Sequence, residues 1–139
     1  MSLEQKRILV TAIPGPLSTQ MQERRKQVIA AGVGTALPVF IDHAHGAIMK
    51  DVDGNQLIDM GSGIGVVTIG HTNARVVEAV QNQVAKLTHT LFTVAPYEPY
   101  VRVGELITKH APGNFAKKAA FFTSGAEAVE NAVKIARHA

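Results

Sequence analysis

The stretch from Phe121 to Glu127 constrains the fold of this 139-residue chain more than any other part of it. Residues 118–122 are mostly apolar and end in two phenylalanines, as short buried strands often do. After the turn that follows, apolar residues recur at helical spacing and would form one stripe of a helix. These residues are Ala126, Val129, Ala132, Val133 and Ala136. The chain is therefore predicted to run from a strand through a tight turn into a helix, as α/β proteins do.

The turn has the sequence of a capping box, because Ser124 is followed three residues later by Glu127. In that motif the serine hydroxyl accepts the N–H of Glu127, and the carboxylate accepts the N–H of Ser124. The N–H groups of Gly125 and Ala126 are then left without a partner, at the helix end where the dipole favours an anion. Gly125 has no Cβ, so a phosphate can approach its backbone closely. Ser124, Gly125 and Ala126 are thus predicted to bind a phosphate monoester; the alternative is an ordinary helix start that binds only water.

The composition is that of a folded protein with a core of its own. Hydrophobic residues make up 46% of the chain and charged residues 18%, which excludes a disordered protein. The net charge of +3 is mild and the basic residues are dispersed, so no nucleic-acid partner is expected. The absence of cysteine excludes disulfides and thiolate metal sites. The apolar run 8–13 is too short for a signal peptide or a membrane span, so a cytoplasmic protein without a membrane partner is expected.

Apolar spacing and turn residues predict three helices and a hairpin before Phe121. Ser18 is the expected N-cap of the first helix, and Gly32 would follow its end. The triplet Asp53-Gly54-Asn55 is typical of a hairpin turn between two strands. The predicted elements are helices over about 19–31, 73–87 and 98–110, and strands over about 39–45, 47–51 and 56–60.

Two patterns of possible metal ligands occur near the hairpin, and neither predicts a metal site. His43 and His45 would share one face of a strand, but the spacing fixes no third ligand beside them. The acidic pair Asp51 and Asp53 lacks the glycine and glutamate positions that a calcium loop requires. Hairpin chemistry explains these residues without a metal.

Three glycines in five residues, Gly61, Gly63 and Gly65, break the regular pattern after the hairpin. Their spacing is not that of a dinucleotide-binding fingerprint. Such a loop either lets the backbone approach a ligand closely or simply turns a corner. Both interpretations remain open from the sequence.

Taken together, these segments resemble the class III aminotransferases, the pyridoxal-phosphate enzymes that act on ω-amino groups, and among them the bacterial 4-aminobutyrate aminotransferases. The resemblance covers about residues 38–137 and depends on the order and spacing of several motifs rather than on one of them. The motifs are Asp51-Val52-Asp53-Gly54-Asn55-Gln56-Leu57-Ile58-Asp59, Gly63-Ile64-Gly65-Val66, Gly70-His71, Tyr97-Glu98-Pro99-Tyr100, Phe115-Ala116-Lys117-Lys118 and the run from Ser124 to Arg137.

The resemblance implies an α/β fold of the pyridoxal-phosphate-dependent transferase type I, incomplete in this chain, and a homodimer with active sites at the subunit interface. Residues 1–60 would belong to the small domain, and residues 61–139 would begin the large cofactor-binding domain. Ser124, Gly125 and Ala126 would hold the cofactor phosphate, although some relatives carry serine where this chain has Ala126. Ile64 would line the substrate pocket; ordinary loop packing is the alternative.

The same resemblance implies transfer of the amino group of 4-aminobutyrate, or of a similar ω-amino acid, to 2-oxoglutarate. The Schiff-base lysine, the aspartate that pairs with the pyridine nitrogen and the carboxylate-binding arginine of the family are expected beyond Ala139. The chain is therefore expected to be the N-terminal part of the enzyme, to contain no catalytic residue and to be inactive alone. Two other classes stay open: a self-contained phosphate- or nucleotide-binding α/β module without catalysis, and a dimerisation or scaffold piece that uses only its helices.

Overall fold

The structure, a computed structural model, describes residues 3–138 and divides into two compact units, one up to Lys86 and one from Leu87 onward. Within the described residues, no helix is both long and apolar enough to cross a membrane. The domain boundary predicted after residue 60 concerns the whole protein and stays a prediction.

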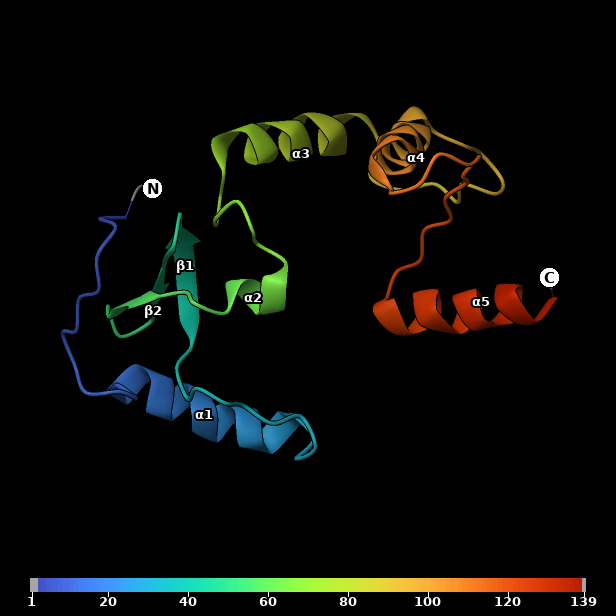
Figure 1. The fold of residues 1–139 in the computed structure, drawn as a ribbon. Coiled ribbons are helices and arrows are strands. Elements are labelled where there is room, and N and C mark those ends of the chain that lie inside the picture. The colour runs from blue at the N-terminus through green and yellow to red at the C-terminus, as the bar shows by residue number, and fades with distance from the viewer. Residues whose placement is uncertain (1–2, 139) are drawn as a thin grey trace. The chain divides into compact units, whose positions relative to one another are not determined.

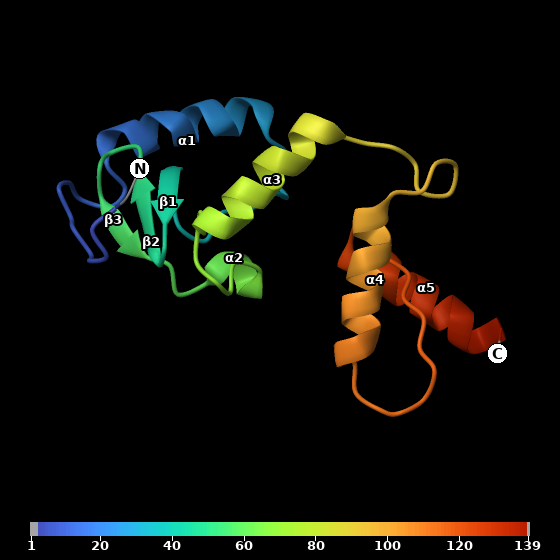
Figure 2. The ribbon, with the colours of Figure 1, turned by 90° about the horizontal axis from the view of Figure 1, so that it is seen from above.

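The first unit contains a three-stranded antiparallel sheet in the order β1-β2-β3, with helix α1 lying at one end of it (Figures 1 and 2). Asp53, Gly54 and Asn55 lie between β2 and β3, so the predicted hairpin turn is confirmed. The predicted helix over 73–87 is also confirmed, as α3. The elements are α1 (Pro16–Val28), β1 (Ile41–His45), β2 (Ile48–Asp51), β3 (Gln56–Ile58), α2 (Ser62–Gly65) and α3 (Ala74–Lys86).

The predicted N-cap of the first helix is wrong, because the acceptor comes from the hairpin instead. Helix α1 begins at Pro16, whose missing N–H costs nothing at a first helical position. The Asp53 carboxylate accepts the N–H groups of Leu17 at 2.7 Å and Ser18 at 2.9 Å. Ser18 lies inside the helix, fully buried, and its hydroxyl accepts the N–H of Phe40. A carboxylate distant in sequence therefore fixes where α1 begins.

Asn55, which is fully buried, ties the N-terminal segment to the hairpin. Its side-chain oxygen accepts the N–H groups of Val10 at 2.8 Å and Thr11 at 3.0 Å. Its amide nitrogen donates to the Thr11 hydroxyl at 2.8 Å and to the Asp51 carboxylate at 2.9 Å. All the hydrogen-bonding capacity of this buried amide is used, so its burial carries no unpaired polar atom.

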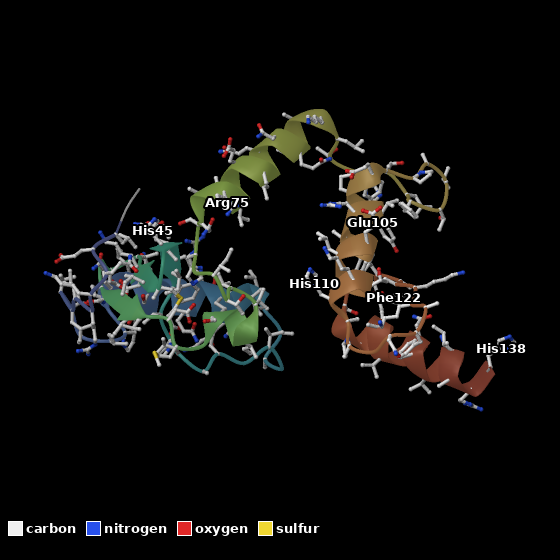
Figure 3. The ribbon with its side chains drawn as sticks, turned by 45° about the horizontal axis from the view of Figure 1, so that its top comes forward. His45, Arg75, Glu105, His110, Phe122 and His138 are labelled. Atoms are coloured by element: carbon white, nitrogen blue, oxygen red, sulfur yellow. The ribbon has the colours of Figure 1, made fainter. Side chains whose placement is uncertain are left out.

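The second unit contains helices α4 (Glu98–His110) and α5 (Gly125–His138), both predicted. Tyr100 of α4 contacts the segment that precedes α5. Its ring stacks on Phe92 with centroids 3.9 Å apart and meets Phe121 edge-on at 4.8 Å. Its hydroxyl accepts the N–H of Phe121 at 3.2 Å. Figure 3 shows Phe122, the next residue, on the stretch that leads into α5.

The strand predicted over 118–122 is wrong for this structure. Side-chain exposure alternates along the segment, with Ala119 and Phe121 half-buried and their neighbours exposed, as in an extended chain. However, a strand also needs a neighbouring strand for its backbone hydrogen bonds. In residues 3–138 the sheet consists of β1, β2 and β3, and the further isolated bridges, such as that from Gln56 to Ile8, do not involve this segment, so it has no strand beside it.

Candidate functional site

The start of α5 forms the predicted capping box. The Ser124 hydroxyl accepts the N–H of Glu127 at 3.2 Å, and the Glu127 carboxylate accepts the N–H of Ser124 at 3.1 Å. The same carboxylate oxygen accepts the N–H of Thr123 at 3.1 Å and the Thr123 hydroxyl at 2.6 Å. The sequence analysis did not predict the contribution of Thr123 to the cap, although a hydroxyl residue next to a capping serine could have indicated it. Four hydrogen bonds thus fix the turn before α5.

These hydrogen bonds keep the Glu127 carboxyl ionised. The bond from the Thr123 hydroxyl, with the smaller contributions of Ser124 and the Thr123 N–H, lowers the pKa of Glu127 below its ordinary value. Partial desolvation acts in the opposite direction and is outweighed. The charged carboxylate lies at the positive end of the helix dipole, where it is most favourable.

Two donors at the start of α5 remain free. The N–H of Ala128 closes the first helical turn on the Ser124 carbonyl at 3.1 Å, whereas the N–H groups of Gly125 and Ala126 bond to nothing in residues 3–138. A Cβ placed at Gly125 would meet no protein atom within 4 Å, so the approach to these donors is open. The Ser124 side chain also hydrogen-bonds to the Glu127 carboxylate, so the free donors at this helix start are the two backbone amides. Two free backbone amides at a helix N-terminus fit a phosphate group, and the binding of a phosphate by Ser124, Gly125 and Ala126 stays a prediction.

The glycine-rich segment after β3 forms a left-handed turn, α2. Four consecutive residues from Ser62 to Gly65 have positive φ, at 46°, 59°, 61° and 76°. Ile64 is the exceptional member, because a β-branched residue rarely adopts this conformation. Its side chain is 95% exposed. The segment therefore turns a corner, and it does so in a way that presents Ile64 outward.

A part-buried hydrogen bond between the side chains of Asp59 and His71 holds both ends of this turn. One oxygen of the Asp59 carboxylate accepts the N–H groups of Gly61 at 3.0 Å and Ser62 at 2.8 Å, and the other lies 2.7 Å from Nε2 of His71. The hydrogen bond from His71 lowers the pKa of Asp59, and the two backbone donors add to that effect against desolvation. The sequence marked Asp59 and His71 only as ends of motifs and gave no sign that they meet.

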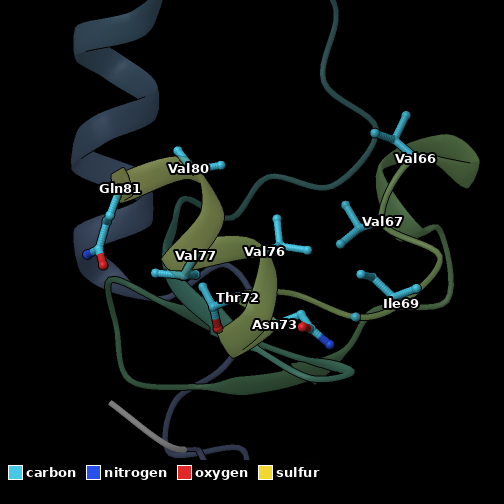
Figure 4. Close-up of a pocket in the computed structure, with 10 residues that line it drawn as sticks. Val66, Val67, Ile69, Thr72, Asn73, Val76, Val77, Val80 and Gln81 are labelled. Carbon is cyan, nitrogen blue, oxygen red and sulfur yellow. The ribbon is translucent and has the colours of Figure 1, made fainter. Parts of the chain in front are cut away.

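An apolar groove of about 460 Å³ lies between the segment after this turn and α3 (Figure 4). Val66, Val67 and Ile69 line one side, and Val76, Val77 and Val80 of α3 line the other. Ile64 is not among its lining residues. The predicted contact of Ile64 with substrate therefore stays a prediction that concerns a different surface.

The histidines of the hairpin, His43 and His45, line a pocket at the start of α3. Nδ1 of His43 is 2.8 Å from the carboxylate of its neighbour Asp42. In the part of the chain that is described, no three histidine, cysteine, aspartate or glutamate side chains are grouped so that they could hold a metal ion. Figure 3 labels His45 on the hairpin and His110 and His138 at the ends of α4 and α5.

Comparison with known proteins identifies the family. The sequence model of the Aminotransferase class-III family matches residues 28–139, most of the chain. The chain belongs to the class III aminotransferases. It is 57% identical to the 4-aminobutyrate aminotransferase of Mycobacterium bovis over 136 residues, which are 98% of this chain and 30% of that protein. It is 49% identical to a 5-aminovalerate aminotransferase of Pseudomonas putida over 119 residues, 86% of this chain and 28% of that protein.

A solved structure agrees with this class III assignment. The acetylornithine aminotransferase of Elizabethkingia anophelis matches with a TM-score of 0.77 and 32% identity, over 86% of this chain and 30% of that one. The predicted α/β transferase fold, incomplete in this chain, is thereby confirmed. The chain spans about 30% of the length of the relatives it matches. Family membership favours the transaminase interpretation over a self-contained phosphate- or nucleotide-binding module.

Lowering the pH should release the Glu127 cap. Because the folded-state pKa of Glu127 is depressed, the cap stabilises α5 above the ordinary pKa of glutamate and is lost as the pH falls through the folded-state value. An NMR titration of the purified chain should show the Glu127 carboxyl and the Ser124 amide shifting together, with a midpoint below that of glutamate in an unstructured peptide. The control, Glu127→Gln, keeps an acceptor but should remove the titration. A midpoint at or above the peptide value would contradict this description of the cap.

Proposed function

We propose that the complete protein is a pyridoxal-phosphate-dependent transaminase that moves the amino group of 4-aminobutyrate, or of a similar ω-amino acid, to 2-oxoglutarate. Family membership supports transamination, and the similarity to 4-aminobutyrate and 5-aminovalerate aminotransferases supports an ω-amino substrate. The single observation that carries the proposal is the pair of unpartnered N–H groups at Gly125 and Ala126. The proposal includes a cytoplasmic homodimer, as the family resemblance implies.

In this proposal the residues at the start of α5 hold the phosphate of the cofactor. The N–H groups of Gly125 and Ala126 donate to phosphate oxygens, and the Ser124 hydroxyl, which hydrogen-bonds to Glu127 in this structure, would turn to the phosphate as a third donor. The Glu127 carboxylate accepts the N–H groups of Thr123 and Ser124, and these hydrogen bonds fix the turn. The N–H groups of the next two residues then point outward. Bound pyridoxal phosphate supplies the electron sink that transamination requires. This chain's residues bind and orient it.

Ile64 has a different role in the proposal, because it contributes an apolar wall for the methylene chain of the substrate. An exposed isoleucine on a turn with fixed backbone can contact an aliphatic chain without rearrangement. Apolar lining with a few polar groups is what a site for such a small amino acid requires. Ile64 belongs to the first unit and the phosphate-binding residues to the second.

The complete enzyme should prefer 4-aminobutyrate. We expect kcat/KM with 2-oxoglutarate as acceptor to be highest for 4-aminobutyrate, lower for 5-aminovalerate and lowest for ornithine, because the second amino group of ornithine would meet an apolar wall. Steady-state kinetics with the three donors at one pH test this order. A clear preference for ornithine would contradict the proposed substrate, and no transamination of any ω-amino acid would contradict the proposed function.

Gly125→Val should weaken cofactor binding with little effect on the fold. A Cβ at this position meets no protein atom within 4 Å, and the branched side chain of valine would occupy the space that a phosphate needs. We expect the Kd for pyridoxal phosphate to rise roughly tenfold or more, which corresponds to a loss of about 1.4 kcal/mol. Gly32→Val is the matched control, because Gly32 also has open space around it but lies far from α5 in sequence. Equal cofactor affinity in the Gly125→Val variant and the parent would refute the assignment.

A further inference from the structure

Asp59 belongs to the first unit and, taken as a whole residue, is half-buried at the start of the glycine turn. Its side chain is only 8% exposed, yet both of its oxygens are used. One oxygen accepts two N–H groups at the start of the glycine turn, and the other lies 2.7 Å from Nε2 of His71. Because a buried charge is unfavourable unless it is paired and hydrogen-bonded, this arrangement needs all its partners.

His71 is in turn fixed to the sheet. Its N–H donates to the Gly46 carbonyl at 2.8 Å, and its own carbonyl accepts the N–H of Gly46 at 3.0 Å. Gly46 lies in the tight connection between β1 and β2. The approach is close, because a Cβ at Gly70 would lie 3.1 Å from the Gly46 carbonyl oxygen. The N–H of Asp59 donates to the Ala47 carbonyl at 2.9 Å, so the Asp59–His71 pair joins two residues that are both hydrogen-bonded to the β1–β2 hairpin and thereby anchors both ends of residues 61–70.

The turn that is held in this way is a strained one. Ile64 has φ 61° and ψ 58°, a left-handed conformation that disfavours β-branched residues. Its side chain is 95% exposed, so packing on the first unit does not keep it there. Strained backbone persists only where the surrounding structure determines it, and here the Asp59–His71 pair and its hydrogen bonds provide that determination.

We propose that Asp59 and His71 are positioning residues that hold Ile64 in its outward position and thereby set the preference of the enzyme for one length of ω-amino acid. This inference rests on the proposed function, in which Ile64 contacts the methylene chain of the substrate. Neither Asp59 nor His71 touches the substrate; both act through the turn. If the Ile64 side chain is held in one position, the site can distinguish 4-aminobutyrate from 5-aminovalerate, which has one more methylene. If the side chain can move, the site accommodates both. One methylene is worth roughly 10- to 200-fold in kcat/KM, which bounds the effect.

The test uses the complete enzyme loaded with pyridoxal phosphate and measures the ratio of kcat/KM for 4-aminobutyrate to that for 5-aminovalerate. The variants Asp59→Asn and His71→Ala should each change this ratio by roughly threefold or more, a small part of the discrimination that one methylene allows. His71→Gln, whose amide can donate to the same carboxylate, should keep the ratio closer to that of the parent. Asp42→Asn is the matched control, because Asp42 pairs with His43 at 2.8 Å on the exposed surface of β1. Its ratio should not change.

A double variant tests whether the effect passes through Ile64. Ile64→Ala should itself change the ratio, and adding His71→Ala should change it no further, because the wall is already gone. Independent, multiplying effects would overturn the inference. So would an unchanged ratio in active His71→Ala enzyme with only a lower Tm, because that is what a merely structural pair would give.

If the parent transaminates neither substrate, the proposed function fails before any variant is compared. If the parent is active and the ratio does not respond, only this inference fails. Should Asp59→Asn not fold, the His71 variants decide.

Discussion

Backbone N–H groups at the start of a helical turn have no backbone acceptor within that turn, and side-chain carboxylates supply acceptors at three places in residues 3–138. Asp53 accepts at the start of α1, Asp59 at the start of the glycine turn and Glu127 at the start of α5. Burial alone would raise the pKa of Asp53, but the hydrogen bonds from Ser18 and Leu17 outweigh it, so the pKa is lowered there as well. In each case the caps decide where the backbone turns, and the turns decide which groups face outward.

The three caps differ in which backbone N–H groups they leave without an acceptor. Asp53 accepts two successive N–H groups at the start of α1, and Asp59 accepts two at the start of the glycine turn. At α5 the capping box takes the N–H groups of Ser124 and Glu127 and leaves those of Gly125 and Ala126 free. Of these three caps, only the one at α5 leaves two successive N–H groups open after a turn fixed by hydrogen bonds, which is the arrangement that a phosphate site needs.

Local features of this structure could be predicted from the sequence, and distant ones could not. The capping box at Ser124 and the hairpin turn at Asp53 depend on residues a few positions apart, so their spacing is visible in the chain. The cap on α1 joins residues 35 and 36 positions apart, and the Asp59–His71 pair joins residues 12 apart. Nothing in the local pattern reveals either one. The prediction of a strand over 118–122 was wrong for a related reason: a strand requires a neighbouring strand, which the composition of the segment itself does not reveal.

The central claim is that the free N–H groups at the start of α5 bind the cofactor phosphate. The most direct test is a crystal structure of the complete protein with pyridoxal phosphate. The claim predicts phosphate oxygens within hydrogen-bonding distance, about 2.7–3.2 Å, of the backbone nitrogens of both Gly125 and Ala126. A well-ordered phosphate bound elsewhere, with these two nitrogens bonded only to water, would contradict it.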